Sequence, residues 1–163
     1  MDADARWVTI AYATEDDVEQ IAPRVRECDR REIWALIHKE PRDALLEMLR
    51  EHDKNARACF LDGKVVALFG MIDEHTDSVT ERAGILWMIG TDEIYENPDL
   101  FHEHTKRWLI RYRQRYDKIS NWVDSRNTTA VEWIKSVGFE VAEPVPVGPD
   151  NVPFHYFVWR RTG

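Results

Sequence analysis

The sequence predicts an α/β fold in which a mixed central sheet of about seven strands carries about four helices on its two faces. Strand-like and helix-like segments follow one another in the order β-α-α-β-β-β-α-β-α-β-β. Two apolar runs, residues 65–72 and 83–90, are typical of central strands that are buried on both faces. Asp62-Gly63 is a two-residue hairpin signal, so part of the sheet must be antiparallel.

Composition favours one globular domain that spans residues 1–163. The net charge of −8 argues against a general nucleic-acid-binding protein. Cys28 and Cys59 lack metal-ligand spacing, so we expect a reduced intracellular protein with no metal site. No apolar run is long enough for a membrane span, and the acidic start MDADARW is unlike a signal peptide, so we do not expect secretion.

The N-terminal segments combine a strand at residues 7–13 with a helix at residues 15–27. Thr14 and Asp17 resemble a capping box at the start of this helix. Pro23 falls inside it and predicts a kink or an early end. A second helix is expected at residues 42–52, followed by a strand at 56–61 and its return strand at 64–72.

The stretch CDRREIWALI, residues 28–37, has two interpretations. It is either a helix–helix junction with surface ion pairs or the floor of a pocket. Under the second interpretation, Arg30, Arg31 and Glu32 belong to a functional surface.

The longest helix should begin at Asn97-Pro98, with Asn97 as its N-cap and proline at the first helical position. His102 and His104 on this helix face different sides and make a poor metal pair. Arginines recur on another face, at Arg107, Arg111 and Arg115. This stripe is either a solvated face or a docking patch for an acidic partner.

A strand–helix–strand unit follows at residues 118–139. Asn127 is a good N-cap for the helix, and Gly138 ends it because glycine readily adopts the left-handed conformation. Asp124 ends the preceding strand, where a carboxylate is either well placed for base catalysis or part of the turn. The proline-rich segment 144–153 predicts a rigid loop before a last strand at 154–161, in which His155 could reach a pocket.

Asn127, Ala130 and Gly138-Phe139 resemble the N-x-x-A…G-F signature of Gcn5-related N-acetyltransferases (GNATs), and the element order matches the GNAT fold over essentially the whole chain. In that family the Asn lies beside the pantetheine arm of acetyl-CoA. The resemblance therefore implies a cofactor site made by Asn127 and by the splayed fourth strand with Trp87, Met88, Ile89 and Gly90.

Two features depart from the family pattern. GNATs hold the pyrophosphate on a glycine-rich turn, but residues 91–99 contain no glycine and carry four acidic side chains, Asp92, Glu93, Glu96 and Asp99. Many GNATs also place a proton-donating Tyr seven residues after the motif Asn, and here that position is Ile134.

Five segments together resemble a GNAT-like family of short tailed-phage and prophage proteins that includes a small internal virion protein: APRVRECDRREIWAL, ILWMIGTDEI, KRWL, NWVDSRNTTAVEWIKSVGFE and GPDNVPFHYF. This resemblance implies a phage origin, with the protein in the host cytoplasm or the virion and a virion or host protein as its partner.

The function has two main alternatives. The first is a GNAT-like scaffold without catalysis or cofactor, acting as a virion or morphogenesis accessory or binding a host protein. The second is an acetyl-CoA-dependent N-acyltransferase for a small or protein amine, in which Asp124 or Glu32 deprotonates the amine and backbone groups of the fourth strand polarise the thioester. A third, inhibition of a host defence or nucleic-acid enzyme, rests on the arginine stripe alone.

Overall fold

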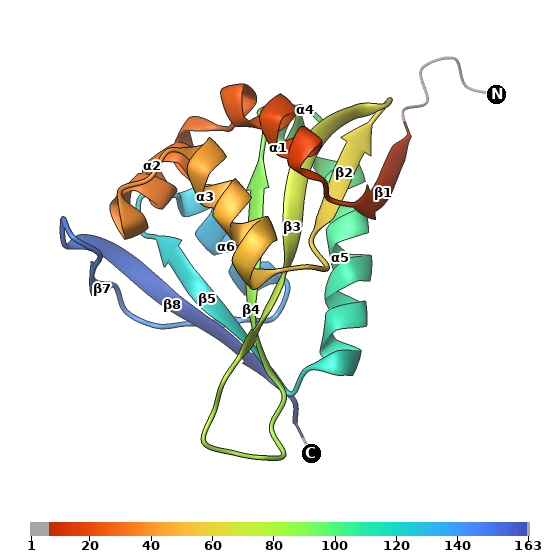
Figure 1. Ribbon diagram of the computed structural model, residues 1–163. Coiled ribbons are helices and arrows are strands. Elements are labelled where there is room, and N and C mark those ends of the chain that lie inside the picture. The colour runs from red at the N-terminus through yellow and green to blue at the C-terminus, as the bar shows by residue number, and fades with distance from the viewer. Residues whose placement is uncertain (1–6, 163) are drawn as a thin grey trace.

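The computed structural model describes residues 7–162, and within them one mixed sheet of eight strands is flanked by helices (Figure 1). The acidic first six residues, on which the signal-peptide expectation rests, lie outside the described residues. The strands are β1 Val8–Tyr12, β2 Arg57–Leu61, β3 Lys64–Glu74, β4 Ala83–Gly90, β5 Lys118–Asp124, β6 Glu140–Val141, β7 Val145–Val147 and β8 Val152–Arg160. The helices are α1 Glu15–Ile21, α2 Glu27–Ile37, α3 Pro41–Glu47, α4 Glu93–Glu96, α5 Pro98–Arg115 and α6 Thr128–Ser136.

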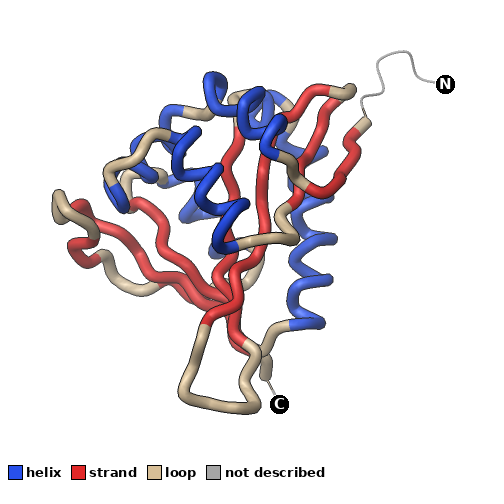
Figure 2. Tube along the Cα trace, viewed as in Figure 1, coloured by secondary structure: helices blue, strands red, loops and turns tan. Residues whose placement is uncertain are grey.

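The strand order is β1-β2-β3-β4-β5-β8-β6, and β7 also pairs with β8. Helices α1, α2 and α3 lie on one side of the sheet, and α5 and α6 lie on the other (Figures 1 and 2). Each side has its own core. On one side, Val18 of α1, Leu45 of α3 and Leu68 of β3 are fully buried against one another. On the other side, Leu109 of α5 and Ile119 of β5 are buried in a second cluster. The predicted mixed sheet with helices on both faces is confirmed.

Strands β4 and β5 are parallel but pair only at their first residues, from Ala83↔Lys118 to Ile85↔Ser120. Beyond Ile85 and Ser120 the two strands separate, and Figure 1 shows β5 and β8 turning away from β4. The expected splay of these two strands is therefore present. It matters because a gap in a sheet exposes backbone groups that a continuous ladder would use.

Several local signals act as predicted. Thr14 and Asp17 form a reciprocal capping box at α1. Asp62 and Gly63 both have positive φ, +51° and +84°, as the tight β2–β3 hairpin requires. Gly138, with φ +97°, follows the end of α6. The early end predicted at Pro23 also occurs, since α1 stops at Ile21 and a short 3₁₀ turn, Ala22–Arg24, follows.

The helix–helix junction expected at residues 28–37 is wrong, because this stretch is almost the whole of α2. The prediction fails because it requires the charged residues in this segment to be exposed at a break between two helices. Two of its charged side chains turn inward: Asp29 is buried beside Arg26, and Glu32 hydrogen-bonds to β5. The segment does line pockets, as the alternative interpretation expected, and the functional surface at Arg30, Arg31 and Glu32 stays a prediction.

Two further expectations need correction near the sheet ends. Residues 144–153 are not only a loop, because β7 pairs with the start of β8 through Val145↔Phe154 and Val147↔Val152. At the other end, α4 lies within the stretch predicted as an acidic loop. Asn97 does occupy the predicted N-cap position of α5, and Pro98 follows it at the first helical position. Its side chain makes no cap hydrogen bond, because its amide donates to the Glu93 carbonyl oxygen instead.

A candidate active site in the cleft between β4 and β5

A cleft of about 460 Å³ occupies the splay between β4 and β5. Its walls come from α2, α5 and α6 as well as from the two strands, so it joins space on both sides of the sheet. The predicted residues Glu32, Trp87, Met88, Ile89 and Asn127 all line it, although they come from three separate parts of the sequence. The fold therefore brings most of the predicted site together.

Backbone groups of β4 open toward this cleft. In an antiparallel pair, alternate residues direct both backbone groups away from the partner strand. Leu86 and Gly90 face the splay in this way, since the Leu86 oxygen accepts from Asn121 Nδ2 (2.6 Å) and the Gly90 N–H donates to Asp29 Oδ2 (2.8 Å). Met88 lies between them in the same phase and lines the cleft. Its N–H and C=O therefore face the cleft at a level where β5 no longer pairs with β4.

Glu32 lies on the α2 wall of the cleft. Its Oε1 atom accepts a hydrogen bond from the Asp124 backbone N–H (2.8 Å), across 92 residues of sequence. Burial is the main reason that the pKa of Glu32 is raised to about 7. The hydrogen bond from the Asp124 N–H lowers this pKa in part, and the negative charges of Asp29 and Asp124 contribute to raising it. A carboxyl group with a pKa near neutrality can accept and return a proton at physiological pH.

Asp124 has a different environment, although its predicted role was the same. The Arg126 side chain grips its carboxylate through Nε (3.0 Å to Oδ1) and Nη2 (2.6 Å to Oδ2), and the Arg126 N–H also donates to it. Burial alone would raise the pKa of Asp124, but these hydrogen bonds from Arg126 outweigh burial and lower it. Asp124 is thus a fixed anion that shapes the turn, and Glu32 has the protonation properties of a base.

The end of β4 is already occupied by the chain itself. Asp29 accepts from the Gly90 N–H, and the Arg26 N–H donates to the Gly90 oxygen (2.9 Å). Asp29 and Arg26 are buried and form an ion pair at 2.8 Å. Ile94 packs over Gly90 so closely that an added Cβ would lie 2.1 Å from its Cδ1 atom. Gly90, a predicted cofactor-binding residue, does not line the cleft, because Asp29, Arg26 and Ile94 cover it.

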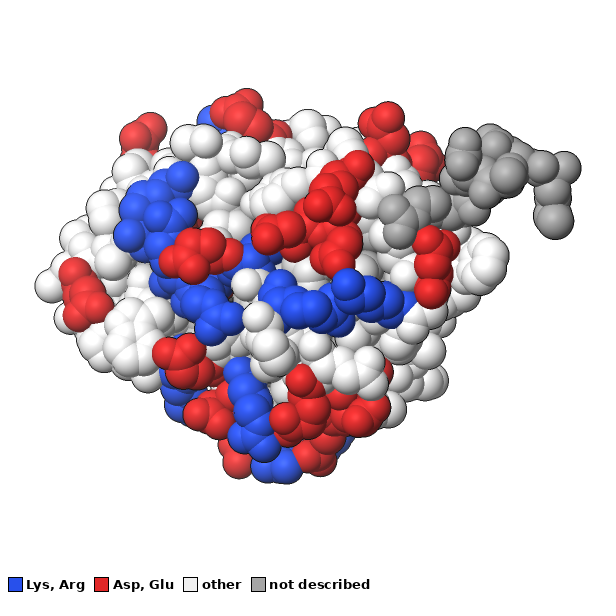
Figure 3. All heavy atoms as spheres, turned by 90° about the horizontal axis from the view of Figure 1, so that it is seen from above, with Lys and Arg blue, Asp and Glu red and all other residues white. Residues whose placement is uncertain are grey.

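The acidic stretch after β4 is partly neutralised. Glu93 pairs with Lys64 (3.0 Å) and approaches Arg24 (3.8 Å), and hydrogen bonds from Thr91 and Lys64 lower the pKa of Glu93 to about 2. The other three carboxylates, Asp92, Glu96 and Asp99, are exposed, and no ion pair involves them among residues 7–162. Figure 3, which looks down on this end of the molecule, shows acidic and basic side chains intermixed.

Asn127 performs the predicted cap, since its Oδ1 accepts from the Ala130 N–H (3.2 Å). It also lines the cleft, and the two interpretations of this residue are compatible. Ile134, at the position of the family tyrosine, lines the cleft too and offers no proton.

The arginines fall into two groups. Arg30 and Arg31 line a second, smaller pocket beside α2. Arg107, Arg111 and Arg115 lie exposed on α5, where Arg111 stacks on the Trp108 ring at 4.7 Å.

The histidines take other roles. His102 Nδ1 accepts from Trp133 Nε1 (2.8 Å) and links α5 to α6. His155 bonds to the Ala142 oxygen and does not line the cleft. Among residues 7–162, only Glu47, Glu51 and His52 lie close enough together to share a metal ion, and Glu47 is already paired with Lys39.

Sequence reasoning missed Asp29, Arg26 and Asn121, which act on the cleft through long-range hydrogen bonds. Their only sequence signal is the presence of polar residues in otherwise apolar helical and strand segments. Cys28 and Cys59 are both free thiols, as expected, and burial raises the pKa of Cys59 to about 12. No helix within residues 7–162 has the length and apolar character needed to cross a membrane.

Known proteins provide comparisons at the level of structure. No protein-family model and no curated protein sequence matches the chain. The structure is similar to Ard1 from Thermoplasma volcanium, with a TM-score of 0.69, 18% identity, and coverage of 96% of this chain and 99% of that one. It is also similar to an aminoglycoside N(6')acetyltransferase from Legionella pneumophila, with a TM-score of 0.69, 14% identity, and coverage of 94% and 91%.

A third similar structure is yncA, a putative acetyltransferase from Salmonella typhimurium with its cofactor acetyl-CoA. Its TM-score is 0.66 at 14% identity, over 94% of this chain and 93% of that one. At such identities the similarity shows the fold alone. The fold of this protein is that of the GNAT acetyltransferases, as its sequence signature predicts.

Proposed function

We propose that this protein transfers an acyl group from a pantetheine thioester, such as acetyl-CoA, to an amine of a small molecule or a protein. One observation carries the proposal. The backbone groups of Met88 and the carboxyl group of Glu32, whose pKa is about 7, face the same cleft. A hydrogen-bond donor for a developing oxyanion and a base for an amine are the two parts that aminolysis of a thioester requires.

Each part has a specific role in the proposal. The Met88 N–H donates to the thioester carbonyl oxygen and stabilises negative charge there as the amine attacks. Glu32 accepts the proton that the amine loses as the C–N bond forms. Because Ile134 has no proton to give, Glu32 or water must supply the proton that the sulfur takes when the C–S bond breaks. The Glu32–Asp124 hydrogen bond holds the base at the end of β5.

The cleft fits the two halves of acetyl-CoA unequally. Its apolar walls, its open backbone groups at Met88 and the nearby Asn127 suit an acyl-pantetheine arm. The phosphate end meets no glycine turn, since Asp29 takes the Gly90 N–H, Ile94 covers that residue, and exposed carboxylates surround the start of α5. We therefore expect the donor to bind mainly through its arm, with a small contribution from its phosphates.

The same filled phosphate region favours a second candidate, a GNAT-like scaffold without catalysis. In that case the exposed arginines of α5 or the α2 surface would bind a partner protein. A role in a phage particle or against a host protein stays a prediction from sequence resemblance.

A ligand-binding experiment separates the two candidates. The thermal midpoint of the purified protein is measured with acetyl-CoA, with S-acetyl-pantetheine and with 3′,5′-ADP, which carries phosphates but no arm. A ligand at about 100 times its Kd adds about 2.7 kcal/mol to stability, which is a shift of several degrees for a chain of this size. We expect acetyl-CoA and S-acetyl-pantetheine to give similar shifts and 3′,5′-ADP to give none.

Thiol release with candidate amines then tests chemistry, using Glu32→Gln as a variant that keeps the hydrogen bond to Asp124 but cannot take a proton. This variant should bind the donor as well as the wild type and lose transfer about 100-fold or more. If neither thioester shifts the midpoint at millimolar concentration, the acyltransferase proposal fails and the scaffold candidate stands.

A further inference from the structure

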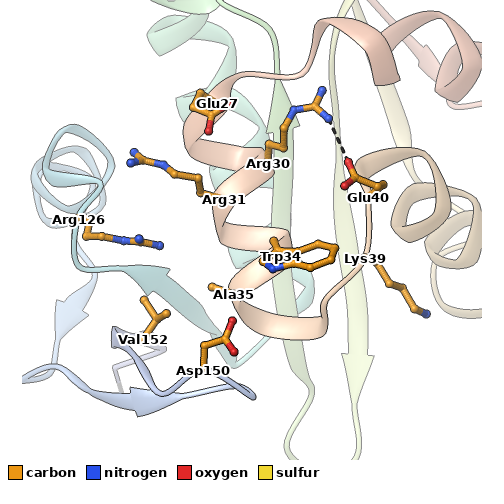
Figure 4. Close-up of a pocket in the computed structure, with 10 residues that line it drawn as sticks. All are labelled: Glu27, Arg30, Arg31, Trp34, Ala35, Lys39, Glu40, Arg126, Asp150 and Val152. Carbon is orange, nitrogen blue, oxygen red and sulfur yellow. Dashed lines mark hydrogen bonds and ion pairs between the residues drawn. The ribbon is translucent and has the colours of Figure 1, made fainter.

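A second pocket of about 300 Å³ lies on the other side of α2 from the cleft. Its walls are α2, the turn after β5 that carries Arg126, and the turn between β7 and β8 (Figure 4). Gly148 in the latter turn, with φ +76°, sits directly on α2, because an added Cβ would lie 2.1 Å from the Ala35 oxygen. The turn between β7 and β8 is therefore held against α2 by close packing and forms a fixed wall of the pocket.

Two guanidinium groups extend into the same gap from different elements, Arg31 from α2 and Arg126 from the turn after β5 (Figure 4). Nε and Nη2 of Arg126 bind Asp124, which leaves its Nη1 atom without a hydrogen bond among the described residues. Arg31 is exposed, and no ion pair or hydrogen bond holds it within residues 7–162. Arg126 is already paired with Asp124 at 2.6 Å, so the charge that stays open in this gap is the guanidinium of Arg31, and Arg126 adds the free donor Nη1. A cationic side chain and a free N–H donor that face the same gap create a place where an anion is stabilised.

The other charges around the pocket are largely compensated. Arg30 pairs with Glu40 at 3.2 Å, and Asp150 pairs with His38 at 2.8 Å. The lining contains four cationic side chains, Arg30, Arg31, Lys39 and Arg126, against three acidic ones, Glu27, Glu40 and Asp150. This near balance suits an anion of single charge better than a phosphate dianion. The free guanidinium fork of Arg31 matches the planar geometry of a carboxylate, and Nη1 of Arg126 offers one further donor.

One chain of contacts joins this pocket to the proposed base. The Asp124 N–H donates to Glu32 in the cleft, and the Asp124 carboxylate accepts from Arg126 in the pocket. Arg31 and Glu32 are also consecutive residues of α2. One turn of α2 and the end of β5 therefore carry both binding groups. Glu32 would bind the amine, and Arg31 and Arg126 would bind the anion.

We propose that the Arg31–Arg126 pocket binds the carboxylate of the acceptor, so that the substrates are amines that also carry a carboxylate. This inference rests on the proposed acyl transfer for the identity of the acceptor. The carboxylate binding itself needs no acyl donor, and the two ideas can fail separately.

The test is calorimetric binding without any acyl donor. The probes are the ω-amino acids from glycine to 6-aminohexanoate, their ω-amino amide counterparts of equal length, and phosphoethanolamine. A charge-assisted hydrogen bond to a guanidinium predicts that at least one amino acid binds about tenfold or more tightly than its amide. Arg31→Gln should remove this preference, Arg31→Lys should keep part of it, and Arg107→Gln on α5 should leave it unchanged.

Equal affinity for acids and amides in the wild type would overturn the proposal, as would a preference that survives Arg31→Gln. Tighter binding of phosphoethanolamine than of every amino acid would overturn the assignment to a carboxylate. Arg31 is exposed, so the Arg31→Gln protein should fold, and its circular dichroism spectrum checks this. Failure of thiol release with every amine, alongside an Arg31-dependent acid preference, would refute the acyl transfer and leave the carboxylate site standing.

Discussion

Replacing Glu32 by glutamine should stabilise the protein above pH 7 and change its stability little at pH 4.5. The folded protein holds the proton of Glu32 more tightly than the unfolded chain does, because burial raises the pKa of this group from 4.5 to about 7. As the pH rises from 4.5 to 7, the unfolded state releases this proton first. Folding stability from this group is therefore fully present below pH 4.5 and is lost as the pH approaches 7.

The magnitude follows from the two pKa values. Each pKa unit corresponds to about 1.4 kcal/mol, so the difference between 4.5 and about 7 corresponds to about 3 kcal/mol. Glutamine keeps an oxygen that can accept from the Asp124 N–H but has no charge to bury. The wild type should lose about 3 kcal/mol of unfolding free energy relative to Glu32→Gln between pH 4.5 and pH 8.

Urea unfolding of both proteins at pH 4.5 and pH 8 gives this difference directly, provided that the m-values agree. Glu27→Gln is the matched control, because Glu27 lies on the same helix but is exposed, and it should show the pH dependence of the wild type. An equal difference between wild type and Glu32→Gln at the two pH values would refute the argument that burial holds this proton. The rate of acyl transfer should also rise through pH 7, since only ionised Glu32 can accept a proton.

Three further changes test other parts of the structure. Gly70→Ala should cost about 3 kcal/mol in urea unfolding, since its Cβ would lie 2.0 Å from the Oδ2 atom of buried Asp53; full retention of stability would show that the carboxylate can move away. Asn127→Ala should cost about 1 kcal/mol of stability through loss of the α6 cap. It should also weaken acetyl-CoA binding in calorimetry, and an affinity equal to that of the wild type would show that Asn127 does not contact the pantetheine arm. The double variant Asp92→Asn and Glu96→Gln should tighten acetyl-CoA binding by about fivefold per carboxylate at low salt and leave S-acetyl-pantetheine binding unchanged. Equal effects on both ligands would contradict the charge explanation.

The sequence by itself determined the local elements of this protein. The Thr14 capping box, the Asp62-Gly63 hairpin, the Asn127 cap and the two apolar central strands each involve residues close in the chain, so their signals survive without tertiary context. The GNAT-like element order follows from these signals, and the splay of β4 from β5 followed from the family resemblance. Expectations failed in α2, where charged side chains turn inward, and in β7, where a proline-rich segment predicted as a loop pairs with the following strand.

Only the tertiary structure decided the chemistry of the site. Asp124 and Glu32 are both carboxylates with similar intrinsic acidity, and each has an arginine close to it in the sequence. Arg126, two residues away, binds Asp124 and holds it as an anion, whereas Arg31 does not bind Glu32. Burial raises the pKa of Glu32 to about 7, at a position where it contacts the Asp124 N–H across 92 residues of sequence. The Gly90 N–H is likewise lost to Asp29, 61 residues away. Solvent exposure and long-range partners set the charge of a group and the availability of a backbone N–H, and neither is encoded within a short stretch of sequence.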